Sequence, residues 1–239
     1  MRMIDLHTHL LPQMDDGSKS VEESHTMLAA LVAQGVDTVA ATPHFYANDE
    51  SVGAFLQRRE AALSRLGATD VNLLCGAEVR YYPGIARMDD LPLLQIGESG
   101  LLLLEMPFAR WTEYTVRELC ELADSRGLQL VLAHIERYLP MQKAAVWQRL
   151  YESGILMQVN ARFVTAPTTR RKALRMLAEG RIHFLGSDCH NTTTRPPQLA
   201  PAAAVIEKRL GAEFMSQMNE FGHTALGQNK TVNHSFEKG

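Results

Sequence analysis

Residues 3–9 read Met-Ile-Asp-Leu-His-Thr-His, a short, mainly apolar run that ends in two histidines separated by one residue. Alternate side chains of a β-strand point to the same side, so the imidazoles of His7 and His9 would lie next to each other. Imidazole is a common ligand of zinc and other transition metals. We therefore predict a first strand over Met3–His7 whose carboxyl end carries a pair of candidate metal ligands.

Six further segments resemble this first one in length and in apolar character. Most of them are apolar on both alternating faces, which is typical of strands that are covered on both sides in a parallel sheet. The seven predicted strands are Met3–His7, Thr38–Thr42, Val71–Cys75, Leu101–Glu105, Gln129–His134, Ile155–Asn160 and Ile182–Ser187.

Amphipathic stretches lie between the predicted strands, and several of them end at a glycine. Ser20 and Glu23 form a capping box, after which apolar residues recur at helical spacing as far as Gly35. The same periodicity is found in residues 112–126, 172–179, 202–210 and 214–221. Strands that alternate with helices indicate a parallel α/β sheet. We therefore expect one domain over residues 1–239, an α/β fold of the (β/α) barrel type, with residues 228–239 as a loose polar tail.

The composition is that of an ordinary globular protein, with 46% hydrophobic and 21% charged residues. A net charge of −3 argues against nucleic acid as the main ligand. Three cysteines cannot all pair with one another, which fits a reducing compartment. The early polar cluster leaves no room for a signal peptide, and no apolar run approaches the roughly 18 residues of a membrane helix. We expect a soluble, cytoplasmic protein that is not embedded in a membrane.

Side chains that can bind a metal end or follow six of the seven predicted strands. In a barrel these strand ends lie on one face, where active sites are found. Buried carboxylates and imidazoles gathered there would need a cation as partner. The predicted ligands are His7, His9, Asp16, His44, Glu78, Glu105, His134, Asp188 and His190. This set exceeds the four donors of a closed zinc site, so we predict two or three ions, with Mn²⁺, Fe or Zn²⁺ favoured over copper.

Two arginines lie close to predicted ligands in the sequence. Arg137 follows His134 by three residues, and Arg195 follows His190 by five. A guanidinium matches phosphate oxygens bidentately and keeps its charge, so a phosphate ester is the expected substrate if both arginines face the site. Metal ions would then convert bound water to hydroxide near neutral pH for hydrolysis. The remaining candidates rank lower: Arg80, Arg110 and Arg162 lack an adjacent ligand, and His25, His183, His223 and His234 are not assigned to the site.

One segment is compatible with a different phosphatase chemistry. Cys189 and Arg195 are separated by five residues, which is the spacing of thiolate-dependent tyrosine phosphatases. The stretch lacks the glycines that turn backbone amides toward a phosphate, and the same spacing recurs between Cys120 and Arg126 in a predicted helix. A thiolate mechanism would also leave the strand-end residues unused, so the metal-dependent hypothesis is favoured.

Taken together, these motifs resemble the polymerase and histidinol phosphatase (PHP) superfamily. The matching segments, in order and with matching spacing, are residues 3–9, 15–17, 41–44, 76–78, 134–138, 186–190 and 195–197. Within the superfamily the chain resembles the bacterial CpsB-type protein-tyrosine phosphatases of capsule and exopolysaccharide systems. This resemblance implies a distorted seven-stranded (β/α) barrel with a trinuclear, usually manganese-supported centre, in which Arg137 and Arg195 bind phosphate.

The resemblance also implies how the ligands are shared and what the substrate is. His7, His9, Glu78 and Asp188 would hold one ion, Glu78 would bridge to a second ion held by Glu105 and His134, and Asp16, His44 and His190 would hold the third. The family's usual substrate is the phosphotyrosine-rich tail of a membrane-associated tyrosine autokinase that controls polysaccharide export. The segment after Pro197 matches the family poorly, so the oligomeric state stays open.

The sequence therefore predicts a metal-dependent phosphatase in which a metal-bound hydroxide attacks the phosphorus of phosphotyrosine. Three alternatives remain open at this point. The same centre could act on histidinol phosphate, another small phosphomonoester or a nucleic-acid end. The chain could be an amidohydrolase-like hydrolase, although those enzymes commonly carry a carbamylated lysine on the fourth strand, which here ends in Glu105. It could also be a non-catalytic binding module whose metals only hold the fold.

Overall fold

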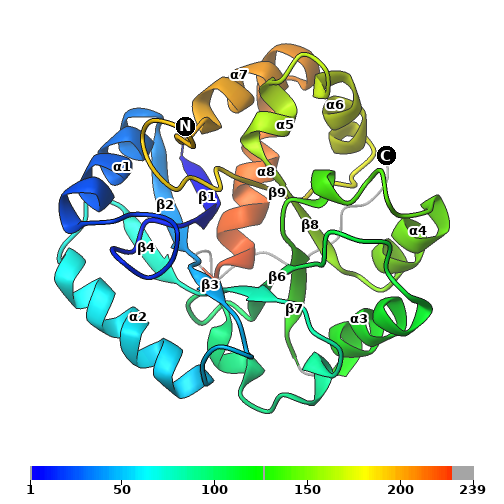
Figure 1. The fold of residues 1–239 in the computed structure, drawn as a ribbon. Coiled ribbons are helices and arrows are strands. Elements are labelled where there is room, and N and C mark those ends of the chain that lie inside the picture. Colours follow the sequence, from blue (N-terminus) through cyan, green and yellow to red (C-terminus); the bar gives the residue numbers. More distant parts are fainter. Residues whose placement is uncertain (1, 126, 228–239) are drawn as a thin grey trace.

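The structure is a computed structural model, and it describes residues 2–125 and 127–227. At its centre lies a curled parallel sheet with helices around its outside (Figure 1). The strands are β1 (Met3–Thr8), β2 (Val36–Ala41), β3 (His44–Phe45), β4 (Asn72–Cys75), β5 (Glu78–Arg80), β6 (Leu101–Glu105), β7 (Gln129–Leu132), β8 (Leu156–Asn160) and β9 (Phe184–Gly186). They pair in the orders β1-β2-β4 and β3-β5-β6-β7-β8-β9, and all of these pairs are parallel.

The two sheets are parts of one distorted barrel. Two residues separate β2 from β3 and β4 from β5, and the pairing stays in step across this gap, from Ala41 opposite Cys75 to His44 opposite Glu78. Pro43 lies in the gap and cannot donate a ladder hydrogen bond, which explains the break in β2. A parallel bridge between Thr8 and Cys189 links the end of β1 to the segment that follows β9.

The expected distorted α/β barrel is confirmed, and each of the seven predicted strands has its counterpart in β1, β2, β4, β6, β7, β8 or β9. Six of the seven differ from the prediction by one or two residues at one or both ends, and one of these differences bears on the candidate site. The fifth predicted strand ended at His134, but β7 ends at Leu132 and His134 adopts a left-handed conformation with φ of 35°. Backbone strain of this kind in a non-glycine residue is concentrated at functional sites.

The helices are α1 (Val21–Ala33), α2 (Val52–Leu66), α3 (Glu113–Ser125), α4 (Ala144–Glu152), α5 (Ala161–Thr165), α6 (Arg170–Ala178), α7 (Leu199–Leu210) and α8 (Ala212–Ala225), with short 3₁₀ turns η1 (Ile85–Arg87), η2 (Leu91–Leu94) and η3 (Ile135–Arg137). Three of these helices, α2, α4 and α5, have no counterpart among those predicted from the sequence. At the start of α1, Ser20 Oγ accepts from Glu23 N, as expected, but the Glu23 carboxylate accepts from Lys19 N, one residue earlier than in a capping box. The predicted tail, 228–239, lies outside the described residues.

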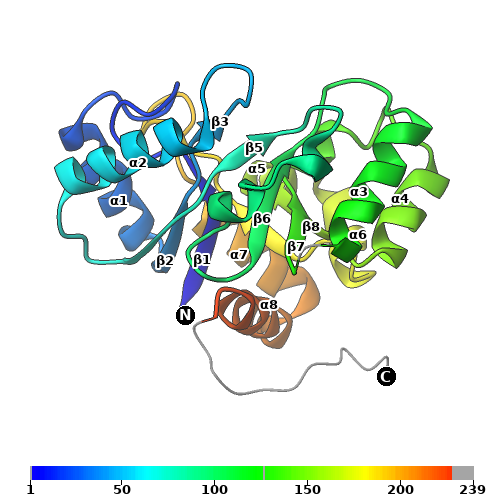
Figure 2. The same ribbon diagram turned by 90° about the horizontal axis from the view of Figure 1, so that it is seen from below.

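Helix α8 covers the amino-terminal end of the barrel (Figure 2). Its Gly222 lies so close to β1 that a Cβ atom there would be 2.7 Å from Ile4 Cδ1. Phe221 of α8 packs against a buried apolar cluster that includes Leu6, Leu103 and Phe184. This end of the barrel is therefore sealed by apolar side chains, which leaves the carboxyl end for polar groups.

Candidate metal centre

A bulge in β1 turns the two histidines of the opening motif into the barrel. Ile4 and Leu6 belong to the interior apolar cluster, so strict alternation would direct His7 to the other face. However, Asp5 pairs with Val39 and Thr8 pairs with Ala41, so β1 has one residue more than β2 between these two pairs. An extra residue of this kind re-aims the side chains that follow it.

All nine predicted ligands lie together at the carboxyl end of the barrel. Their donor atoms form four overlapping groups, each with its atoms within 4.8 Å of one another. The groups are His9, Asp16, His44 and His190; His7, His9 and Asp188; His7, Glu78 and His134; and His44, Glu78 and Glu105. Because several residues belong to two groups, the arrangement has the form of a cluster site for more than one ion.

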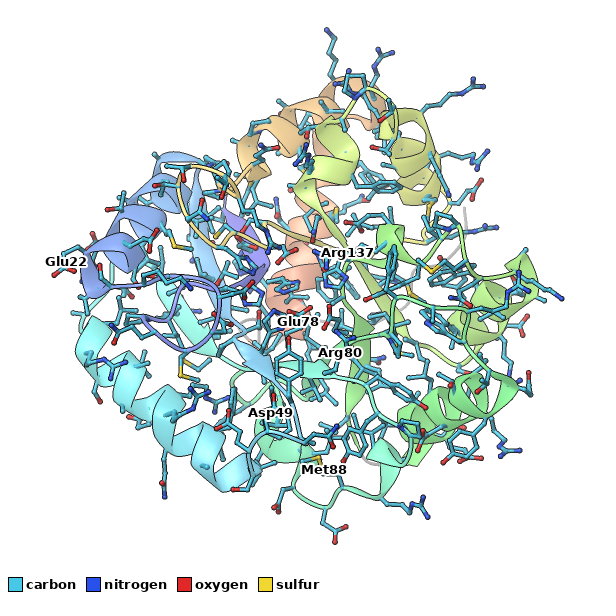
Figure 3. The ribbon with its side chains drawn as sticks, viewed as in Figure 1. Glu22, Asp49, Glu78, Arg80, Met88 and Arg137 are labelled. Atoms are coloured by element: carbon cyan, nitrogen blue, oxygen red, sulfur yellow. The ribbon has the colours of Figure 1, made fainter. Side chains whose placement is uncertain are left out.

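Glu78 lies near the centre of the barrel (Figure 3) and belongs to two of the four ligand groups. Its Oε1 is 2.7 Å from His134 Nε2, and its Oε2 is 3.0–3.3 Å from ring nitrogens of His7, His9 and His44. The side chain is only 1% exposed. A buried carboxylate with four imidazoles around it has the position of a bridging ligand.

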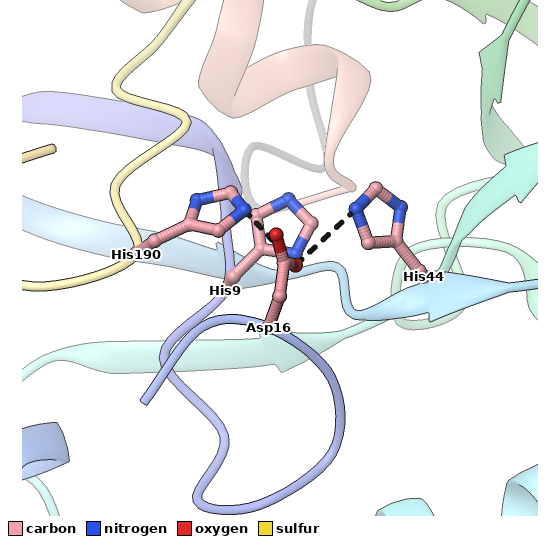
Figure 4. Close-up of side chains that lie close together, drawn as sticks. All are labelled: His9, Asp16, His44 and His190. Atoms are coloured by element: carbon pink, nitrogen blue, oxygen red, sulfur yellow. Dashed lines mark ion pairs between the residues drawn. The ribbon is translucent and has the colours of Figure 1, made fainter. Parts of the chain in front are cut away.

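Asp16 lies between His190 and His44 (Figure 4). Its Oδ1 lies 3.3 Å from His190 Nε2 and 3.6 Å from His44 Nε2. The Asp16 side chain is 66% exposed, whereas His190 is buried, so this side of the cluster is open to solvent. Asp16 is therefore a ligand candidate that solvent reaches directly, unlike the buried His190.

The donor atoms fit cations better than they fit one another. His7 Nε2 and His9 Nε2 are 3.0 Å apart, although the pair can share only one proton in that contact. His44 Nδ1, His190 Nε2 and Glu78 Oε2 are buried and make no hydrogen bond with the described residues. Buried polar atoms are normally paired, and divalent cations would complete the coordination of all of these atoms.

The electrostatics keep the acidic members of the cluster ionised. Burial by itself would raise the pKa of Glu78, but the charge of His7 and a hydrogen bond from His134 hold it well below its usual range. In the same way, burial opposes ionisation of Asp188, while His7 and His9 lower its pKa well below the ordinary value. Both side chains are therefore anionic at neutral pH and are suitable metal ligands.

Asp15 is a residue that the sequence analysis left unassigned within the Asp15-Asp16-Gly17 turn. Its Oδ2 accepts from His9 Nδ1 at 2.7 Å and from His44 N at 2.9 Å, and its Oδ1 accepts from Gly17 N. A carboxylate on the far nitrogen of an imidazole fixes the ring and raises its basicity as a ligand. The turn packs so closely against His9 that a Cβ on Gly17 would be 2.1 Å from the His9 carbonyl oxygen. Only glycine therefore fits at position 17 without a shift of the backbone.

Strand β8, the one predicted strand without a ligand at its end, supports the ligands of its neighbours. Gln158 Oε1 accepts from His134 N at 2.6 Å and lies 3.4 Å from His7 Nδ1. Asn160 Nδ2 donates to Asp188 Oδ2 at 2.8 Å. The sequence analysis missed both residues because they carry no charge and bind no metal.

Arg137 and Arg195 meet beside the cluster. Arg137 Nη2 donates to Asp188 Oδ2 at 2.7 Å, and Arg195 Nη2 forms an ion pair with the same oxygen at 2.7 Å. Arg80, which ranked lower among the candidates, binds Glu105 at 2.9 Å. The sequence indicates this position of Arg80, because it follows Glu78 by two residues and alternate residues of a strand share a face.

Two cavities flank the cluster. The first, which we call the arginine cavity, measures about 210 Å³ and is lined by residues that include Arg137, Asn160, Arg162, Asp188, Thr194 and Arg195. The second, the acidic cavity, measures about 500 Å³ and is lined by residues that include Asp15, Asp16, His44, Asp49, Glu50 and Arg58. An anionic substrate is attracted to the first cavity and repelled by the second.

The thiolate alternative is contradicted by the surroundings of Cys189. The side chain is fully buried, and burial raises the pKa of its thiol to about 12, so almost no thiolate forms at neutral pH. The amides of Thr193, Thr194 and Arg195 donate to Asn191 Oδ1 and so do not form a phosphate-binding loop.

The histidines that were not assigned lie elsewhere. His25 is exposed on α1, His223 lies on α8 with its ring 3.7 Å from Asp37, and His183 Nδ1 accepts from Met157 N. His234 lies outside the described residues. None of the eight helices is long and apolar enough to cross a membrane, a finding limited to the described residues.

Comparison with known proteins gives relatives that cover nearly the whole chain. The tyrosine-protein phosphatase YwqE of Bacillus subtilis is 30% identical over 96% of this chain and 93% of its own length. The tyrosine-protein phosphatase CpsB of Streptococcus pneumoniae is 31% identical over 90% of this chain and 94% of its own length. A crystal structure from work on these two proteins, described as metal-dependent tyrosine phosphatases, matches with a TM-score of 0.80 and 27% identity over 96% of both chains.

The family comparison agrees with these relatives and with the resemblance found in the sequence. The model that describes capsular polysaccharide synthesis proteins of the CpsB/CapC type matches residues 3–222. That range contains all nine residues of the cluster and both arginines that bind Asp188. The chain belongs to the CpsB/CapC family of capsular polysaccharide synthesis.

Proposed function

We propose that this chain is a metal-dependent protein-tyrosine phosphatase in which Arg137 and Arg195 bind the phosphoryl group. The observation that carries the proposal is the meeting of both guanidinium groups at Asp188, a residue that also belongs to the nine-residue cluster. An anion bound by these arginines would lie directly beside the cluster. The relatives named as tyrosine-protein phosphatases support the same activity.

We assign the nine clustered side chains as ligands of two or three Mn²⁺ ions. Five imidazoles and four carboxylates suit Mn²⁺, Fe or Zn²⁺, and the buried Cys189 thiol is not available as a ligand. When bound, the ions would lower the pKa of a water molecule and neutralise phosphate oxygens. The distribution of the ligands among the ions follows the division that the resemblance implies.

The protein's own side chains hold and neutralise the substrate. Arg137 and Arg195 present fixed positive charge to the phosphoryl oxygens, whose negative charge must be stabilised as the bond to the leaving group breaks. The leaving phenolate has a pKa near 10, so it departs without a strong general acid. Asp15, Gln158 and Asn160 keep the ligands oriented through the hydrogen bonds described above.

We further propose that the substrate is the phosphotyrosine tail of a membrane-associated tyrosine kinase and that the protein acts in the cytoplasm as a single domain. The link of the family to capsular polysaccharide synthesis supports this partner. The three free cysteines, Cys75, Cys120 and Cys189, are consistent with a reducing compartment.

The test is phosphate release by metal-stripped protein before and after Mn²⁺ is restored, with three substrates in parallel. A phosphotyrosine peptide, the matching phosphoserine peptide and histidinol phosphate separate the proposed activity from its alternatives. We expect Mn²⁺-dependent release from the phosphotyrosine peptide in preference to the other two. Release that survives complete removal of metal would refute the metal-dependent mechanism, and preference for histidinol phosphate would refute the protein substrate.

A further inference from the structure

Arg162 is a third cation of the arginine cavity, and the proposed phosphatase reaction does not use it. Its side chain lines the cavity together with Arg137 and Arg195. Arg137 and Arg195 are both bound by Asp188, but Arg162 forms no ion pair with the residues that the structure describes. A guanidinium cannot lose its charge, so Arg162 keeps an unmatched positive charge in this cavity.

Arg162 differs from the other two arginines of the cavity in its ion pairs. Arg137 and Arg195 both pair with Asp188, and Arg137 also lies 3.9 Å from Glu105, whereas no described carboxylate pairs with Arg162. The neighbouring polar side chains, among them Asn160 and Thr194, are neutral. Two arginines match the two charges of a phosphate monoester, and the third remains for another anion.

The position of Arg162 suits a group that lies beside the phosphotyrosine. Asn160 ends β8 and is held to Asp188, and Arg162 follows it by two residues in α5, so the backbone that carries Arg162 is anchored to the cluster. The Arg162 residue itself is exposed at the edge of the cavity. This exposed position suits contact with the flanking part of a large substrate. The phosphoryl group itself must reach Arg137 and Arg195 beside Asp188.

The opposite side of the cluster cannot serve the same purpose. The acidic cavity contains Asp15, Asp16, Asp49 and Glu50 against a single arginine, Arg58, which Glu50 already binds at 2.8 Å. A second anionic group on a substrate would be repelled there. The direction in which an anionic substrate extends is therefore set by the charge of the two cavities.

We propose that Arg162 forms a subsite for a second anionic group that the substrate carries close to its phosphotyrosine. The group is a carboxylate of an acidic residue or a second phosphate, and both can bind a guanidinium bidentately. This inference rests on the proposed phosphatase function, since it assumes that Arg137 and Arg195 receive the phosphotyrosine.

The test compares three phosphotyrosine peptides that differ at one flanking residue, which is alanine, glutamate or phosphoserine. The variant is Arg162→Gln, and the control is Arg171→Gln, which removes an exposed arginine of α6 outside the cavity. We expect the wild-type protein to prefer the two acidic peptides, and Arg162→Gln to reduce the ratio of kcat/KM for acidic over alanine peptide about tenfold, the effect of one charged hydrogen bond. Arg171→Gln should leave this ratio as it is, and the glutamate and phosphoserine peptides show which anion is bound better.

A binding measurement keeps the outcome independent of catalysis. The same peptides with a phosphonomethyl-phenylalanine in place of phosphotyrosine cannot be hydrolysed, and fluorescence anisotropy gives their Kd ratios. If no peptide is hydrolysed but the acidic ones bind more tightly in an Arg162-dependent way, the phosphatase proposal fails and the subsite stands. Equal binding of all three peptides by the wild type, or an equal loss for all three in Arg162→Gln, overturns the subsite. Arg162→Glu should bind a lysine-flanked phosphonate peptide more tightly than the glutamate-flanked one.

Discussion

Replacing Asp15 by asparagine tests whether a residue that touches no metal controls the metal affinity of the cluster. The two carboxylate oxygens of Asp15 accept three hydrogen bonds, from His9 Nδ1, His44 N and Gly17 N. Asparagine offers only one acceptor oxygen, because its other terminal atom is a donor. In either orientation of the amide, at least one of the three donors therefore faces an NH₂ group.

The expected loss of metal affinity follows from the loss of the carboxylate partner of His9. The ionised Asp15 fixes the ring so that Nε2 faces the cluster. Burial by itself would lower the pKa of His9, but the hydrogen bond to Asp15 and the charge of that carboxylate help to raise it. Loss of such a partner typically weakens metal affinity by about 10–100-fold, or about 1.4–2.7 kcal/mol. We expect Asp15→Asn to shift the Mn²⁺ concentration for half-maximal activity upward by this factor while turnover at saturating Mn²⁺ changes less.

The assay is a Mn²⁺ titration of metal-stripped protein, followed by phosphate release and, independently, by calorimetry. Asp49→Asn is the matched control, because Asp49 is an exposed acid that lines the same acidic cavity and belongs to none of the ligand groups. If both variants lower the affinity for Mn²⁺ equally, the effect is only the loss of a nearby negative charge. If Asp15→Asn binds Mn²⁺ as tightly as the wild type, the role given to the carboxylate is wrong.

Three further predictions follow from the same geometry. Arg137→Ala should lower kcat for a phosphotyrosine peptide by about 10²–10³-fold while metal content, measured by elemental analysis, is retained, because Asn160 and Arg195 still bind Asp188. Cys189→Ala should remain active in the same assay, whereas a thiolate mechanism requires complete loss. Burial lowers the pKa of His183 to about 4, so protonation favours the unfolded chain, and between pH 6.5 and pH 4 the free energy of unfolding should fall by about 3 kcal/mol. Denaturant titrations should show this contribution in the wild type but not in His183→Asn, which does not titrate.

The strand ends were predictable because the carboxyl ends of parallel strands meet on one face, whatever the details of each strand. His44 and Glu78 illustrate this, since they come from separate segments and lie opposite each other in the register. The side to which a residue points was less predictable. Nothing in residues 3–9 reveals that β1 gains a residue relative to β2, yet that bulge directs His7 and His9 into the barrel.

The supporting residues were the hardest to find from sequence. Asp15 and Asp16 are adjacent and chemically alike. Asp15 accepts from His9 Nδ1, whereas Asp16 faces the cluster from the solvent side. Only the path of the turn decides between them, and that path depends on the close packing of Gly17 against His9. Gln158 gave no signal because a buried amide in a strand is ordinarily read as a polar residue of the core.

The fold separates the two tasks of this molecule along the barrel axis. Phe184 and Leu6 pack with α8 at the amino-terminal end, where apolar burial supplies stability. At the carboxyl end, Glu78 Oε2, His44 Nδ1 and His190 Nε2 are buried without a hydrogen-bond partner among the described residues, which costs stability in the metal-free chain. Metal binding should therefore stabilise the carboxyl end, because a ligand that binds only the folded state raises its stability by mass action. The same unpaired atoms that cost stability in the metal-free chain are the ones that a cation can bind.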